Sequence, residues 1–222
     1  MSSAPPSNLD AKLAALRLEY ARAGLTEGEL APTPLAQLER WLGEAIAAGV
    51  REANAFTLAT ASPDGAPNAR ILLLKGFDAR GLTFFTNYDS AKGRELAANP
   101  RACAVLFWHE LERQARVVGD VEKVTRAESE AYFHSRPRGS QLGALASDQS
   151  TVVPSRDALE ARLAQLAARF GEGPIPLPDY WGGYRLVPRS LELWQGRPDR
   201  MHDRLRYRQD AHGRWVIERL SP

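Results

Sequence analysis

The stretch AFTLATASPDGAPNARILLLKGFDARGLTFFT, residues 55–86, decides the fold of this chain. Its apolar segments are separated by two turn sequences, Ser62-Pro-Asp-Gly65 and Asp78-Ala-Arg-Gly81. Strands joined by turns this short pair antiparallel, because parallel strands need long crossover connections. The continuous apolar middle of the second segment also predicts a strand that is buried on both faces. We expect strands at residues 55–61, 70–75 and 82–86.

The flanking sequence adds helices and more strands around this centre. Thr33 can cap a helix with Pro34 in its first turn, an apolar face from Leu35 to Ile46, and Gly49 at its end. Further helices are expected at residues 9–23, 90–98, 126–133 and 155–170, the last with Leu159, Leu163, Leu166 and Phe170 facing inward. Further strands are expected at residues 101–108, 113–124, 183–187, 191–194, 205–208 and 215–218. The predicted fold class is mainly β with peripheral helices (α+β), built as an antiparallel meander or small barrel.

The chain is expected to have three parts. Residues 1–8 are rich in Pro and Ser and are expected to be disordered. Residues 9–52 form an N-terminal helical segment that packs on the barrel. Residues 53–222 form the barrel domain, which contains a helical insertion at about residues 126–171 and ends in the C-terminal strands.

The composition excludes several classes of protein. The 222 residues carry a net charge of only +2, whereas a general nucleic-acid binder needs a spread excess of Lys and Arg. No apolar run reaches the length of a membrane span, and the first residues do not resemble a signal peptide, so we expect a cytoplasmic protein. The single cysteine, Cys103, excludes an intrachain disulfide, and the four histidines lack metal-ligand spacing, so no metal site is expected.

A segment near the C-terminus, Trp194-Gln-Gly-Arg-Pro-Asp-Arg-Met-His-Asp-Arg204, combines three arginines with a histidine and a tryptophan. Arginine grips phosphate or carboxylate with paired hydrogen bonds, histidine exchanges a proton near neutral pH, and tryptophan offers a flat face to a ring. These residue types indicate a pocket for an anionic, aromatic small molecule. A solvated basic loop explains the composition equally well.

Two polar groups on the central strands also suggest anion sites. Arg70 and Lys75 are five positions apart, so on one strand they are expected to face opposite sides of the sheet. In Thr86-Asn-Tyr-Asp-Ser-Ala-Lys92, hydroxyl groups and a lysine precede a helix, which favours phosphate. Strand-end charges and an ordinary helix N-cap at Ser90 are the alternatives.

A third group lies in the predicted helical insertion. Tyr132, Arg136 and Ser140 are spaced four apart, although Pro137 makes an unbroken helix doubtful. Two hydroxyls and a guanidinium can converge on one phosphate. A polar helix terminus explains the same residues equally well.

Taken together, these stretches resemble the pyridoxine/pyridoxamine 5′-phosphate oxidase family, from about Leu16 to Pro222. The resemblance implies an FMN-binding split β-barrel with its active sites at a homodimer interface that the C-terminal strands help to form. It rests on many motifs in one order: Arg70–Lys75, Phe85-Thr-Asn87, Asn99-Pro-Arg101, Leu111-Glu-Arg-Gln114, Tyr132–Arg138, Ser140-Gln-Leu-Gly143, Gln149-Ser150, Trp181-Gly-Gly183, Trp194-Gln-Gly196, Arg200–Arg204 and Glu218–Pro222.

The resemblance implies a role for each polar group. Arg200 and His202 would be the catalytic residues, placed against the pyridine ring of the substrate. The FMN site would consist of Arg70, Ile71, Leu72, Lys75, Phe85, Thr86, Ser90, Lys92, Gln114, Gln149, Ser150, Trp194 and Arg204. The substrate site would consist of Lys75, Tyr132, Arg136, Ser140, Arg200 and His202, with Arg17 and Tyr20 in an N-terminal piece that closes over the substrate.

The implied reaction is the oxidation of pyridoxine 5′-phosphate or pyridoxamine 5′-phosphate to pyridoxal 5′-phosphate. A hydride passes from C4′ of the substrate to N5 of FMN, Arg200 and His202 orient the ring and assist proton removal, and O2 reoxidises the flavin to give H2O2. A split-barrel flavin reductase or dehydrogenase with another acceptor is one alternative, and a protein that carries FMN or pyridoxal phosphate without turnover is another. Ala91 stands where the family usually has an arginine aimed at the FMN phosphate, so we expect weaker FMN retention.

Overall fold

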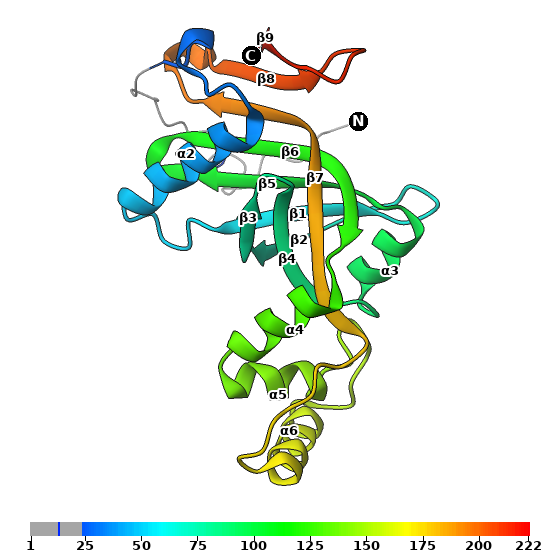
Figure 1. The fold of residues 1–222 in the computed structure, drawn as a ribbon. Coiled ribbons are helices and arrows are strands. Elements are labelled where there is room, and N and C mark those ends of the chain that lie inside the picture. Colours follow the sequence, from blue (N-terminus) through cyan, green and yellow to red (C-terminus); the bar gives the residue numbers. More distant parts are fainter. Residues whose placement is uncertain (1–12, 14–23) are drawn as a thin grey trace, which may run out of the picture.

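The computed structural model of the protein describes Leu13 and residues 24–222. Within this part, nine strands form one sheet with antiparallel pairing throughout, and helices lie at its periphery (Figure 1). The predicted fold class is therefore confirmed. The expected disorder at residues 1–8 and, apart from Leu13, the expected helix at residues 9–23 lie outside the described residues. The strands are β1 Ala55–Ala61, β2 Pro67–Leu73, β3 Gly76–Asp78, β4 Gly81–Asn87, β5 Arg101–Trp108, β6 Arg113–Lys123, β7 Trp181–Gln195, β8 Asp203–Gln209 and β9 Trp215–Leu220; the α-helices are α2 Pro34–Ala47, α3 Ala91–Ala98, α4 Arg126–Ser135, α5 Arg138–Ala146 and α6 Arg156–Phe170.

Strand β7 organises the sheet, whose order is β2-β1-β5-β6-β7-β4-β3. β6 pairs along one side of β7, while β4 pairs with its first half and β8 with its second half. The sequence predicted two separate strands, at residues 183–187 and 191–194, but the structure has one. The pairing continues past Pro188 because a bulge between Val118 and Gly119 of β6 shifts the register there. Gly119 is required at this bulge, since an added Cβ would lie 1.9 Å from the Val187 carbonyl oxygen.

Strand β2 lies at an edge of the sheet and corrects two expectations. It ends at Leu73, so Lys75 lies beyond it, and the expectation that Arg70 and Lys75 occupy opposite faces of one strand is wrong. Ile71 is 73% exposed instead of buried on both faces, because β2 pairs only with β1 and no described residue covers this side chain.

The main hydrophobic core lies between α2 and the sheet. Trp41 of α2 meets Trp108 of β5 edge-on, with ring centroids 6.3 Å apart, and Phe56 of β1 packs against Phe84 of β4. Thr33 caps α2 with its side chain, as the sequence predicted. This core fixes the strands whose ends carry the candidate site.

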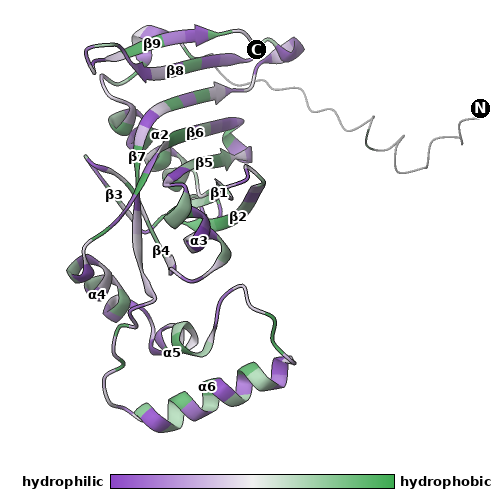
Figure 2. Ribbon diagram, turned by 90° about the vertical axis from the view of Figure 1, so that its right-hand side faces the viewer, coloured by the Kyte–Doolittle hydropathy of each residue, from purple (hydrophilic) through white to green (hydrophobic). Residues whose placement is uncertain are grey.

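The helices α4, α5 and α6 lie together beyond one end of the sheet (Figure 2). Pro137 separates α4 from α5, and α5 was not expected from the sequence. α6 has no buried residue, although four of its apolar residues were predicted to face inward. It packs mainly on α5, at the far end of the molecule, so only Leu166 and Phe170 approach the small core beneath these helices. Among the described residues, no helix combines the length and the apolar character needed to cross a membrane.

Candidate functional site

One cavity collects four residues of the predicted substrate site, Lys75, Tyr132, Arg136 and Ser140. It has a volume of about 420 Å³ and lies where α4 and α5 meet the ends of β2 and β4. Because Pro137 ends α4 and lets α5 start in a new direction, the spacing of four still brings the hydroxyl, guanidinium and hydroxyl groups to one cavity. Its lining includes Lys75, Tyr132, Arg136 and Ser140, together with Leu72, Phe85, Thr86 and Gln149 from the predicted FMN site.

Arg136 is a half-buried cation with one buried, unused hydrogen-bond donor. Its guanidinium carbon lies 4.8 Å from the centre of the Trp181 ring, and its Nη1 is buried without an acceptor among the described residues. Burial lowers the pKa of Arg136, but an arginine stays charged at any ordinary pH. A buried, charged donor without a partner is costly, so the arrangement fits an anionic group in the cavity.

Aromatic rings form the wall behind this guanidinium. Tyr132 stacks on Phe85 with ring centroids 3.9 Å apart, and its ring is nearly parallel to that of Trp181. Burial raises the pKa of the Tyr132 hydroxyl, which therefore stays protonated and can donate a hydrogen bond. Gly182 follows Trp181, and an added Cβ there would lie 2.2 Å from the Tyr88 hydroxyl, so a larger residue would force Tyr88 to move.

Lys92 is a second cation, and it is buried behind the cavity wall. Its Nζ donates to Thr86 Oγ1 at 3.2 Å, to Ser90 Oγ at 3.2 Å and to Gln149 Oε1 at 2.9 Å. Burial, together with the nearby charge of Arg70, lowers the pKa of Lys92 to about 8. These three acceptors are neutral oxygens, and the lysine lies in the first turn of α3, where backbone N–H groups favour an anion. The donor set therefore fits the phosphate of FMN.

Arg70 lies close to Lys92 but is held by protein groups. Its Nη2 is 3.2 Å from Glu95 Oε2, and its Nη1 donates to Thr60 Oγ1 at 2.6 Å. Glu95 also accepts from Asn68 Nδ2 at 2.9 Å. Sequence reasoning assigned no role to Glu95; its position in α3, four residues after Ala91, was the only available signal.

The remaining predicted residues form a second group on β6, β7 and β8. Gln114, Trp194 and Arg204 lie directly opposite one another on these three strands. The His202 ring lies 4.7 Å from the Trp194 ring. Arg204 donates from Nε at 2.9 Å and from Nη2 at 2.8 Å to Oε1 of the buried Glu192, a partner that the sequence did not suggest.

The cavity lies beside α4 and α5, and the second group lies where β8 pairs with β7. Figure 1 shows α4 and α5 at one end of β7 and β8 at the other. Trp181 lines the cavity and Trp194 lies 13 residues further along the strand. At about 3.3 Å per residue, that separation is about 40 Å of strand. Within one protomer the two predicted half-sites are therefore not brought together.

Four predicted residues stand apart from both groups or outside the described chain. Ile71 projects from the edge strand without lining the cavity, and Ser150, beside Gln149, is exposed with a positive φ of 71°. Arg17 and Tyr20 lie outside the described residues.

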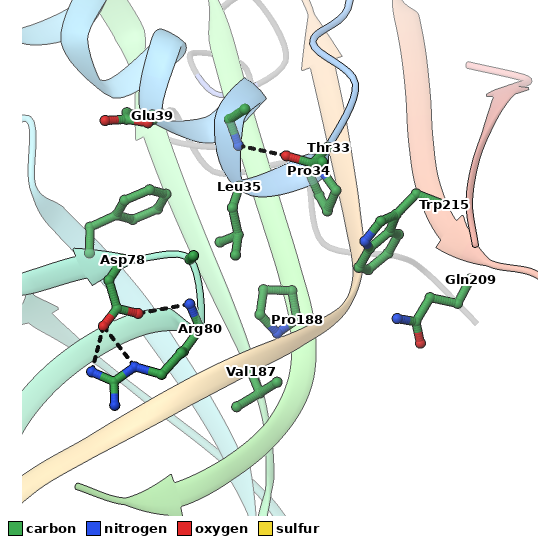
Figure 3. A pocket seen from close by; sticks show the side chains of 13 residues that line it. Thr33, Pro34, Leu35, Glu39, Asp78, Arg80, Val187, Pro188, Gln209 and Trp215 are labelled. Atoms are coloured by element: carbon green, nitrogen blue, oxygen red, sulfur yellow. Dashed lines mark hydrogen bonds and ion pairs between the residues drawn. The ribbon is translucent and has the colours of Figure 1, made fainter. Parts of the chain in front are cut away.

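A larger cleft, of about 610 Å³, lies between the start of α2, the β3–β4 turn and β9 (Figure 3). Its only lining arginine, Arg80, donates from Nε and Nη2 to Asp78, and Leu35, Pro188 and Trp215 supply much of the remaining wall. None of the predicted site residues that the structure describes lines it. Its one guanidinium is already neutralised, so it offers no comparable anion site.

Comparison with known proteins places the chain among relatives of one kind. A family model described as "Pyridoxamine 5'-phosphate oxidase" matches residues 42–170, and one described as "Pyridoxine 5'-phosphate oxidase C-terminal dimerisation region" matches residues 181–222. A "Pyridoxine/pyridoxamine 5'-phosphate oxidase" of Ralstonia pickettii (strain 12J) is 59% identical over 95% of this chain and 99% of its own. A protein of the same name from Burkholderia multivorans (strain ATCC 17616 / 249) is 57% identical over 95% of this chain and 99% of its own.

A solved structure supports the same fold. The structure of PhzG from Burkholderia lata 383, in complex with tetrahydrophenazine-1-carboxylic acid, matches with a TM-score of 0.84 and 34% identity. The match covers 89% of this chain and 98% of that one. The predicted split-barrel architecture is therefore confirmed.

Proposed function

The chain belongs to the pyridoxine/pyridoxamine 5′-phosphate oxidase family of FMN enzymes, and from this premise we propose that it oxidises pyridoxine 5′-phosphate and pyridoxamine 5′-phosphate to pyridoxal 5′-phosphate. The observation that carries the choice of substrate is Arg136, whose buried Nη1 has no acceptor among the described residues in a cavity that Lys75 also lines. Two cations and two hydroxyls around one cavity suit a phosphate better than a neutral group.

Each part of the cavity has a distinct task in this proposal. Arg136, Lys75, Tyr132 and Ser140 bind the substrate phosphate and thereby fix the distance of the pyridine ring from the wall. Because this binding energy comes from a remote, non-reacting group, it can be used to orient the reacting carbon. The aromatic wall excludes water from the phosphate site.

The residues behind the wall hold the cofactor. Lys92, Thr86 and Ser90 bind the FMN phosphate at the start of α3, and Arg70, which is held by Glu95 and Thr60, lies beside them. Gln149, Gln114, Trp194 and Arg204 are the further FMN contacts that we propose. When bound, FMN accepts the hydride from the substrate and passes the electrons to O2.

The active form is a homodimer in this proposal. Because about 40 Å of strand separates the two half-sites in one protomer, the cavity of one copy needs Trp194, Arg200 and His202 from a second copy. The open sheet face that carries Ile71 and the 52% exposed Phe107 offers apolar area for this contact. We further propose that this dimer acts in the cytoplasm.

Purification and an anaerobic half-reaction test the oxidase. A yellow protein whose flavin absorbance is bleached by pyridoxamine 5′-phosphate without air, and which releases H2O2 when air returns, is the expected result. Arg136→Gln should raise the KM for the phosphorylated substrate, while Arg169→Gln, an exposed arginine that also lies over an aromatic ring, should not. A colourless protein that no added FMN activates would refute the proposed function.

Subunit mixing tests the shared site. At a substrate concentration well below the parent's KM, Arg136→Gln and Arg200→Gln should each lose most of the activity, since each damages one half of every site. After unfolding and joint refolding, half of the dimers are hybrids with one intact site of two, so about a quarter of the parent activity should return. No recovery from a mixture that does form hybrid dimers would show that each site is built from one protomer.

A further inference from the structure

The connection between β7 and β8 is shaped around His202. The backbone N–H of Arg197 donates a hydrogen bond to His202 Nδ1, at 3.1 Å. A ring nitrogen that accepts a hydrogen bond has a free lone pair and no proton of its own. In a neutral imidazole the other nitrogen then carries the proton, so the backbone of this connection selects the tautomer with hydrogen on Nε2.

Several contacts fix the ring and the backbone in this arrangement. The Trp194 ring lies 4.7 Å from the His202 ring. The next residue, Asp203, accepts from the backbone N–H of Leu25 at 3.0 Å and from Arg219 Nη1 at 2.6 Å, and its Oδ2 is 3.6 Å from Arg197 Nε. These contacts hold both the donor, Arg197, and the acceptor, His202, in place. The folded backbone therefore determines which tautomer of His202 is present.

The backbone of the connection is strained where it leads to His202. Asp199 and Arg200 are consecutive non-glycine residues with positive φ, 53° and 59°. Such a conformation is unfavourable for a non-glycine residue and persists only where the surroundings dictate it. The bond from Met201 N to the Pro198 carbonyl oxygen, at 3.1 Å, closes the turn. The surrounding contacts therefore hold Arg200 and His202 in one defined geometry.

We propose that His202 acts on the substrate as a hydrogen-bond donor through Nε2–H, and that it does not accept the proton released in the oxidation. This inference rests on the proposed function. It revises the expectation that His202 assists proton removal, because its basic nitrogen is occupied by the Arg197 N–H. The hydride of the C4′–H bond goes to FMN, and the hydroxyl proton of pyridoxine 5′-phosphate goes to water.

The charge state of the ring agrees with this geometry. Burial, and then the positive charge of Arg200, lowers the pKa of His202, which favours the neutral ring. Protonation of the neutral ring would also add a hydrogen to Nδ1. This hydrogen would face the Arg197 N–H, so two donors would oppose each other.

Nitrogen NMR on the holoenzyme labelled with ¹⁵N-histidine reads the tautomer directly. The chain has four histidines, and the signal that His202→Gln removes is that of residue 202. We expect a pyridine-like Nδ1 and a pyrrole-like Nε2 at neutral pH. The opposite assignment, or a doubly protonated ring, would overturn the proposal. The NMR measurement needs no turnover, so the two proposals can fail separately. If the proposed oxidase function is wrong, the parent protein shows no activity; if only the donor role is wrong, the protein is active but has the other tautomer.

Two substitutions test the donor role. The amide nitrogen of a glutamine reaches about as far as Nε2 and donates, whereas that of an asparagine reaches only as far as Nδ1. His202→Gln should therefore keep kcat/KM within about tenfold of the parent, and His202→Asn should lose about a further tenfold, the value of one hydrogen bond. His212→Gln, in the exposed β8–β9 turn, is the control. Equal losses in the glutamine and asparagine variants would overturn the proposal.

Discussion

Replacing Lys92 by methionine is expected to change FMN binding and protein stability in opposite directions. In the protein without FMN, this ammonium is buried against three neutral oxygens. The nearby Glu95 offsets the desolvation cost of this charge only in part, and a bound phosphate would offset it further, so removal of the charge eliminates a cost in the apoprotein. Lys92→Met should therefore weaken FMN binding while it stabilises the apoprotein.

The size of both effects follows from the environment of Lys92. Its pKa falls from 10.5 to about 8, and at 1.36 kcal/mol per unit this corresponds to about 3 kcal/mol of destabilisation below pH 8. The gain in Lys92→Met should be smaller, because three hydrogen bonds are lost. A charge-assisted hydrogen bond to the FMN phosphate contributes about 1.5–3 kcal/mol, which corresponds to an increase in Kd of about 10- to 150-fold.

The pH dependence of apoprotein stability is an independent test of the buried charge on Lys92. The pKa of Lys92 is lower in the folded protein than in the unfolded chain, so the unfolded chain binds more protons between pH 8 and 10.5. The contribution of Lys92 to the unfolding free energy of the apoprotein should therefore rise with pH in this window. Lys92→Met should lack that rise.

Flavin fluorescence titration and urea unfolding of the apoprotein measure the two quantities. Lys123→Met is the control, because Lys123 is exposed and lies over the Tyr88 ring instead of the FMN site. Its Kd for FMN should equal that of the parent. A Lys92→Met protein with unchanged FMN affinity and a destabilised apo form would refute the assignment of Lys92 to the cofactor phosphate.

Three further substitutions probe the same region. Ala91→Arg restores a cation at the start of α3 and should lower the Kd for FMN by tenfold or more, about 1.5–3 kcal/mol; an unchanged Kd in titration would show that the arginine is not missed here. Trp181→Leu removes the ring beneath Arg136, worth about 0.5–2 kcal/mol, and should raise the KM for pyridoxine 5′-phosphate more than that for unphosphorylated pyridoxine in steady-state assays; equal changes would contradict a phosphate-specific effect. Gly93→Ala would place a Cβ 2.0 Å from a backbone oxygen and should cost about 1–3 kcal/mol in urea unfolding, whereas Gly139→Ala, with open space around it, is the matched control and should not be destabilised.

The strands and turns of this chain could be predicted from the sequence because their signals lie within short segments. Alternating or continuous apolar segments and the turns at residues 62–65 and 78–81 need no distant partner to be recognised. The reading failed where burial decides the outcome: Ile71 is apolar but lies on an edge strand, and α6 has an apolar stripe but no buried residue. Whether an apolar side chain is covered depends on neighbours that are remote in sequence.

The candidate site shows the same division. The sequence by itself determined which residue types are present in each segment, and the family resemblance gave them tasks. Only the tertiary structure placed Arg136 over Trp181 and Lys92 among neutral oxygens, because those contacts join α4 to β7 and α3 to the segment after α5. It also placed Trp194 and His202 at the other end of β7, since the length of a paired strand sets a separation that residue type cannot reveal.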